Sequence, residues 1–228
     1  MPRMTRRRLR GEAGHSLPEM LAGMVVAAIV GWATVTLTLT GSQAATQVQD
    51  RTEANQRVRQ LLDRMVTTLS SQVCIDALRP PIGEGTRDAV TFYTDLGGQD
   101  FAPEQHRLAY DAATRTVTET VWAGAGTPPD VTFPGPGVTR VLATDVEPGP
   151  DGLLRYFAFT PAQPTKPEVE LPVPISATDA RRIVRIHLSV RATPERRAAD
   201  LRSASQDADA FVGSLEATTD PTNGPRCT

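Results

Sequence analysis

The chain lacks most of the residue patterns from which enzyme and metal sites are built. Its two cysteines are too few for a disulfide framework or a four-cysteine zinc site. No two of its three histidines, His15, His106 and His187, have the spacing of a zinc-binding H-E-x-x-H motif. No serine stands in G-x-S-x-G, and no loop matches the phosphate-binding pattern G-x-x-x-x-G-K-[ST]. We therefore expect a protein that is not an enzyme and holds no cofactor or metal.

Aromatic residues make up only 5% of the 228 residues, whereas glycine and proline are frequent, with 17 and 19. This composition indicates one domain with a modest, loop-rich core and accessory segments. Positive charge is concentrated in residues 1–14, which hold five arginines and one glutamate. The remaining residues comprise 19 basic and 25 acidic side chains, a poor match for nucleic-acid phosphates. We expect no nucleic-acid partner.

An uncharged segment follows the basic N-terminus. Met20–Thr40 has no charged residue over 21 positions, about the length that a helix needs to cross a bilayer. The preceding arginines place the N-terminus in the cytoplasm by the positive-inside rule, and the residues after Thr40 outside. We expect a single-pass protein of the cytoplasmic (inner) membrane, in contact with lipid, with its C-terminal domain outside.

The helical pattern continues beyond the membrane segment. Apolar residues recur at three-to-four spacing over residues 48–73, with charged residues between them and no proline. We expect one helix from Ser16 to about Val73. Residues 15–41 would form its transmembrane half, and residues 42–73 an amphipathic continuation.

After Arg79 the sequence changes to short alternating runs separated by glycine and proline, which is typical of antiparallel strands and turns. The predicted fold class is therefore α+β, with a long N-terminal helix packed on a mainly antiparallel β-sheet domain over residues 74–192. Residues 193–228, rich in alanine, aspartate and serine, are expected to form a weak surface helix and a disordered tail. The expected strands are Ala89–Thr94, a hairpin of Arg107–Asp111 and Thr116–Trp122, then Val138–Val146, Leu153–Thr160 and Ile183–Arg191.

The two cysteines stand at the end of the expected helix and near the C-terminus. An oxidising compartment outside the cytoplasm would favour a disulfide between Cys74 and Cys227. Such a bond would tie the C-terminus to the end of the helix. Two unpaired thiols are the alternative.

The junction between the basic leader and the apolar segment reads GHSLPEML, from Gly14 to Leu21. This segment resembles the processing site of type IV prepilins and of the pseudopilins of type II secretion. In that family a prepilin peptidase cuts after the glycine on the cytoplasmic side, and a glutamate is the fifth residue of the mature protein. The resemblance implies that residues 1–14 are a cleaved leader, that His15 is the new and potentially methylated N-terminus, and that Glu19 is that glutamate.

The resemblance also implies a role for this segment in filament assembly. The family's glutamate is thought to meet the N-terminal amine of a neighbouring subunit, here Glu19 with His15, and Leu17 and Pro18 belong to the same segment. A carboxylate at the membrane edge is costly without a partner, which independently favours a special role for Glu19. The family usually has phenylalanine and an aliphatic residue at the first and fourth mature positions, where this chain has His15 and Pro18.

Over residues 14 to about 192, the order of helix and strands resembles that of minor pilins and J-type minor pseudopilins. The implied function is a structural subunit that assembles through its N-terminal helix into a type IV pilus or a secretion pseudopilus, and that initiates or caps it. The implied partners are other pilins or pseudopilins, the prepilin peptidase and the inner-membrane assembly platform.

Other interpretations of the same residues remain open. Ser16 and Glu19 form an S-x-x-E capping box, and Pro18 suits the first turn of any helix, so this segment could begin an uncleaved anchor. Residues 42–44, Ser-Gln-Ala, offer an ordinary signal-peptidase site, which would release a secreted binding domain beginning at Ala45. A membrane-anchored enzyme is a third interpretation, without a recognisable nucleophile or cofactor loop to support it.

Overall fold

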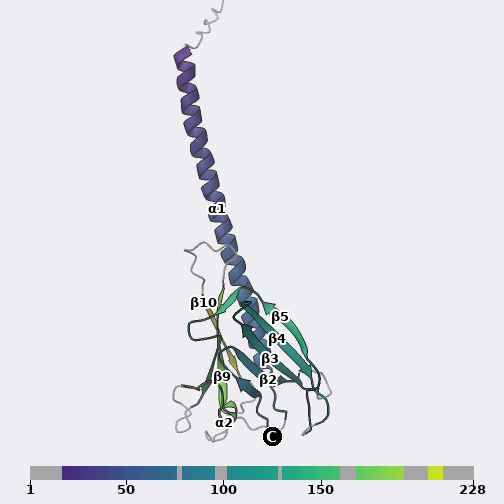
Figure 1. Cartoon of the computed structure of the whole chain (residues 1–228). Helices are drawn as coiled ribbons and strands as arrows, with labels where there is room; N and C mark the ends of the chain where they lie inside the picture. Colours follow the sequence, from purple (N-terminus) through teal and green to yellow (C-terminus); the bar gives the residue numbers. More distant parts are fainter. Residues whose placement is uncertain are drawn as a thin grey trace, which may run out of the picture. The chain divides into compact units, whose positions relative to one another are not determined.

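The computed structural model describes residues 17–75, 79–95, 102–127, 130–159, 168–192 and 205–212. The chain divides into two compact units, Met1–Gln49 and Asp50–Thr228, and helix α1 (Leu17–Ser70) contributes to both. The second unit also holds the short helix α2 (Ala177–Ala180) and the strands of two sheets (Figure 1). These strands are β1 (Ile82–Gly85), β2 (Ala89–Thr94), β3 (Glu104–Asp111), β4 (Thr116–Ala123), β5 (Val138–Ala143), β6 (Val146–Pro148), β7 (Leu154–Ala158), β8 (Val169–Glu170), β9 (Ile183–Ala192) and β10 (Ser205–Phe211).

Helix α1 runs without interruption over 54 residues, which confirms the expectation of one long helix. It ends at Ser70, slightly before the expected Val73. Directly after the helix, Gln72 forms an isolated bridge to Thr94 at the end of β2, so the chain passes from helix into sheet. In the second unit, α1 buries apolar side chains at helical spacing, namely Ala54, Val58, Leu61, Leu62, Met65 and Leu69.

The first sheet is antiparallel, with the strand order β1-β2-β3-β4-β5. Its β3–β4 hairpin confirms the expected pair of strands and extends it at both open ends. In the turn, the Asp111 carboxylate accepts hydrogen bonds from the Ala113 backbone N–H and the Thr114 hydroxyl. These bonds satisfy the turn locally, as is usual for aspartate.

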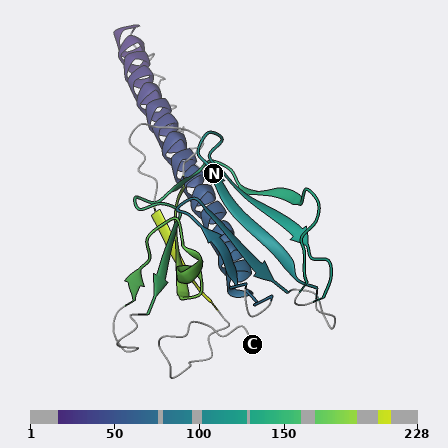
Figure 2. The same cartoon turned by 60° about the horizontal axis from the view of Figure 1, so that its bottom comes forward.

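The second sheet has the order β10-β9-β7-β8, and β6 also pairs with β9. Strand β9 confirms the clearest expected strand: Ile186, Leu188 and Val190 are fully buried, while Arg185 and His187 lie toward solvent. In Figure 2 the green and yellow strands of this sheet and the teal strands of the first sheet lie on either side of the blue end of α1.

One hydrophobic core joins both sheets to the end of α1. Met65 and Leu69 of the helix share it with side chains such as Phe92 of the first sheet and Tyr156 of the second, all of them fully buried. The Tyr156 hydroxyl donates a hydrogen bond to the Thr86 carbonyl at 3.0 Å, which satisfies its one polar group. The structure thus confirms an α+β fold with a long N-terminal helix packed on antiparallel sheet.

Two expectations about the strands were wrong. Val138–Val146 is not one strand, because β5 ends at Ala143 and Asp145 adopts a positive φ of 55°, after which β6 begins. Arg115, also at positive φ, holds that turn through an ion pair of 3.1 Å with Asp145. Within the segment expected to be a weak helix and a disordered tail, Ser205–Phe211 instead forms strand β10, which pairs with β9 along its whole length. The sheet domain therefore extends past residue 192.

Candidate functional site

The expected assembly segment, Gly14 to Glu19, ends in the first residues of helix α1. Leu17, Pro18 and Glu19 form the first turn, where proline costs no hydrogen bond and the helix dipole favours a carboxylate. Gly14, His15 and Ser16 lie outside the described residues. Cleavage after Gly14 and capping by Ser16 therefore stay predictions.

The first half of α1 exposes its apolar side chains all round. Leu17 and Trp32, for example, are 77% and 78% exposed. In the described part of the chain, α1 is the one helix long and apolar enough to cross a membrane. An apolar surface of this size is unfavourable in water, so it needs lipid or other helices around it.

Four threonine hydroxyls on this half of α1 are satisfied within the helix. The hydroxyls of Thr34, Thr36, Thr38 and Thr40 each donate to the backbone carbonyl four residues earlier, at 2.6 to 2.8 Å. Such bonds remove the cost of placing a hydroxyl in hydrocarbon, where no water is available. The threonines are therefore compatible with a helix that could span a membrane.

A buried ion cluster joins α1 to the first sheet in the second unit. At its centre Glu119 of β4 has a fully buried side chain. His106 Nδ1 of β3 lies 2.8 Å from Glu119 Oε1, and Arg140 of β5 donates from Nε at 2.8 Å to Oε2. Arg64 of α1 lies 3.6 Å from the same oxygen. Residues of both neighbouring strands and of the helix thus converge on one carboxylate of β4.

The electrostatics of this cluster favour an ionised glutamate. Burial alone would raise the pKa of Glu119, but hydrogen bonds with His106 and Arg140 outweigh it and hold that pKa below the usual range. Phe92 stacks on the His106 ring, with centroids 5.4 Å apart. Both carboxylate oxygens already have partners, so the cluster is suited to fixing the helix on the sheet rather than to acid–base catalysis.

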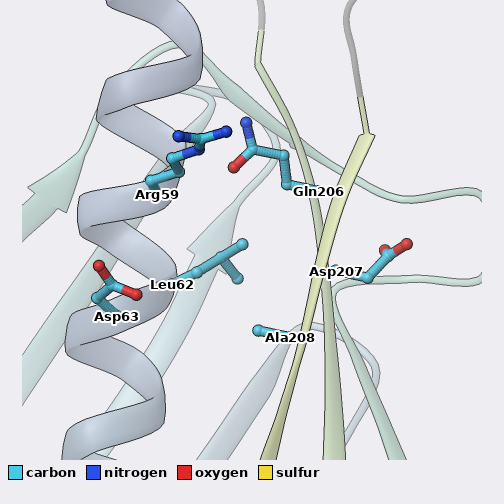
Figure 3. Close-up of a pocket in the computed structure, with 6 residues that line it drawn as sticks. All are labelled: Arg59, Leu62, Asp63, Gln206, Asp207 and Ala208. Carbon is cyan, nitrogen blue, oxygen red and sulfur yellow. The ribbon is translucent and has the colours of Figure 1, made fainter.

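A polar pocket of about 430 Å³ lies between the same stretch of α1 and β10. Figure 3 shows Arg59 and Leu62 extending from α1 toward β10, and Gln206 extending back toward α1. The Gln206 amide also donates to the Asn55 carbonyl at 3.4 Å. This pocket marks where the last described strand meets the helix.

The outer face of the second sheet is occupied by paired charges. Arg185 donates to Glu168 at 2.6 Å and to Asp209 at 2.7 Å, and its guanidinium lies 4.0 Å from the centroid of the Phe157 ring. His187 Nδ1 lies 2.8 Å from the same Asp209 carboxylate. On this face Arg185, His187 and Asp209 are therefore engaged with one another. No group of three or more potential metal ligands occurs among the described residues.

Cys74 forms a disulfide. Its expected partner, Cys227, lies outside the described residues, so the pairing of these two residues stays a prediction.

The sequence matches no protein-family model and no curated protein.

The buried ion cluster was missed at the level of sequence, although a signal for it exists. Glu119 stands two residues after Val117 in an alternating strand, on the side that the apolar residue predicts to be buried. His106 stands in the same relation to Leu108 in β3. A charged residue at an inward position indicates a buried partner. This signal appears only when each position of a strand is assigned to its inward or outward face.

Proposed function

We propose that this chain is a non-enzymatic structural subunit of the minor pilin or pseudopilin type. It would be inserted in the cytoplasmic membrane by α1 and would assemble through that helix into a type IV pilus or a secretion pseudopilus. Its domain from residue 50 onward would lie outside the cytoplasm. In assembly it would initiate or cap the filament, with other pilins, the prepilin peptidase and the inner-membrane platform as partners.

One observation carries this proposal: Glu19 stands in the first turn of a helix that is otherwise uncharged up to Gln49 and exposed on all sides, directly after the Gly14-His15 junction. An ordinary anchor needs no carboxylate at this depth, whereas a helix that packs among identical amine-bearing termini gains a partner for it. The end of α1, buried against two sheets, would carry the domain on the filament surface.

The processing step tests the proposal directly. The full chain would be co-expressed with an active prepilin peptidase or with an inactivated one, and its intact mass measured after extraction from membranes. We expect a mature N-terminus at His15 only when the peptidase is active. The Gly14→Leu variant should stay uncleaved with either peptidase. A mature N-terminus at Ala45 in the medium would instead support a secreted binding domain, and an intact leader under all conditions an uncleaved anchor.

Assembly tests the role of the carboxylate. Glu19→Ala should be cleaved as well as the unchanged protein but should enter filaments about tenfold less, equivalent to about 1.4 kcal/mol of lost pairing. Incorporation would be measured by immunoblotting of sheared filaments. Asp63→Ala removes an exposed carboxylate from the same helix outside the membrane segment and is the matched control. Equal incorporation of Glu19→Ala and Asp63→Ala would contradict the pairing.

A further inference from the structure

The face of the first sheet that points away from the core has a groove of about 390 Å³. Strand pairing places Tyr93, Gln105 and Trp122 side by side on β2, β3 and β4. Their chain neighbours Phe92 and His106 point to the opposite face, where they are buried. The groove is lined by Gly83, Glu84, Thr91, Tyr93, Gln105, Arg107 and Trp122.

Both aromatic side chains of this groove are held from behind. Tyr93 stacks on Phe133, with ring centroids 5.4 Å apart and planes 23° apart. Trp122 lies against Gly137, where a Cβ would come within 2.6 Å of its ring, and the positive φ of 71° suits glycine. Because the rings are fixed in advance, a ligand that stacks on them loses little ordering free energy on binding.

Three polar side chains of the groove have no partner among the described residues. The side chains of Glu84, Gln105 and Arg107 make no hydrogen bond or ion pair within the part of the chain that the structure describes. Together they offer carboxylate acceptors, guanidinium donors and an amide with both. Their charges cancel, which favours a neutral ligand rich in both donors and acceptors.

We propose that this groove binds a neutral oligosaccharide. The C–H faces of sugar rings pack on aromatic rings, whose faces carry partial negative charge, while sugar hydroxyls can bond to the three unpartnered side chains. Tyr93 and Trp122 stand two strand spacings apart, about 10 Å, so the ligand has more than one sugar unit. A proline-rich peptide also stacks on aromatic rings, but it would bury these polar groups without enough partners.

Binding can be followed through one tryptophan. Trp32→Phe in the membrane helix leaves Trp122 as the single emitter in the full-length protein, kept in a detergent without a sugar headgroup. The probes are cellohexaose, chitohexaose, xylohexaose and mannohexaose, with oligogalacturonate as an acidic comparison and decaproline as the peptide. We expect saturable fluorescence change with at least one neutral hexasaccharide at concentrations below about 10 mM.

Variants separate the groove from adventitious binding. Tyr93→Ala should weaken the affinity for the hexasaccharide at least tenfold, and Gln105→Ala at least fivefold. Phe211→Ala removes an exposed ring on the other sheet and should leave this affinity unchanged. Gln105→Ala keeps both aromatic rings, so a folded variant is available if Tyr93→Ala is unstable. Binding of decaproline or oligogalacturonate alone, no binding at all, or equal affinity in all variants would overturn the proposal.

Discussion

At the scale of the residue, Glu119 shows how one buried charge can be tolerated. Its carboxylate is fully removed from water, a transfer that is costly for an unpaired ion. Arg140 Nη2 at 2.6 Å and His106 at 2.8 Å compensate on both oxygens. Arg140 and Arg64 are each 48% exposed, so solvent screens the attraction between their guanidiniums and the Glu119 carboxylate. These ion pairs are therefore weaker than fully buried ones.

Glu119→Gln should lower the free energy of unfolding by about 2 kcal/mol at pH 7, since the neutral amide can still accept a hydrogen bond but forms no ion pair with the guanidiniums. The pKa of Glu119 is lower in the folded protein than its ordinary value of 4.5, so its contribution is complete above that value and disappears as the pH falls through the folded pKa. The difference between the unchanged protein and the variant should therefore shrink as the pH falls below 4.5. Denaturant titrations at several pH values measure it.

Glu104→Gln is the control for this prediction. The Glu104 carboxylate also contacts His106, at 3.3 Å, but it is 38% exposed and should contribute little. If both variants changed stability equally, or if the Glu119→Gln difference grew in acid, the buried ion pair would not be the source of the effect.

At the scale of the element, helices and strands with strong periodicity could be predicted from the sequence. Strands that depend on distant partners could not. Helix α1 and strand β9 follow from the spacing of their apolar residues alone. Strand β10 does not, because Ser205–Phe211 is made largely of aspartate and alanine, which seldom form strands. Its aspartates are paired across the ladder: Asp209 with Arg185 and His187, and Asp207 with the Ser189 hydroxyl at 2.6 Å.

The division of the strands between two sheets also depends on distant contacts. Alternating apolar residues identify a strand but not its neighbour in the sheet. Strands β6, β7 and β10 all pair with β9, although β6 and β7 precede it in the chain and β10 follows it. The groove of Tyr93, Gln105 and Trp122 exists because of such pairing across three strands. Its residues are spread over 30 positions of sequence, so no local motif announces them.

At the scale of the whole molecule, the candidate functions are carried by different parts of the chain. The assembly segment is contiguous from Gly14 to Glu19, so sequence alone could suggest it. The sheets assemble their groove from separate strands, and only the folded structure brings it together. A structural subunit and a ligand-binding domain are therefore compatible within one chain.

The expected disulfide between Cys74 and Cys227 would link the end of α1 covalently to the C-terminus. Cys74 follows α1 by four residues, and 152 residues separate it from Cys227. Closing a loop of that length removes chain entropy from the unfolded state, equivalent to at most about 5 kcal/mol. Cys74→Ser and Cys227→Ser should each lower the free energy of unfolding by the same amount, and the double variant no further, because one bond is lost in every case. Thermal unfolding under non-reducing conditions measures these differences, and reduction of the unchanged protein should reproduce them. Additive losses, or disulfide-linked dimers on a non-reducing gel, would mean that the two cysteines have separate partners.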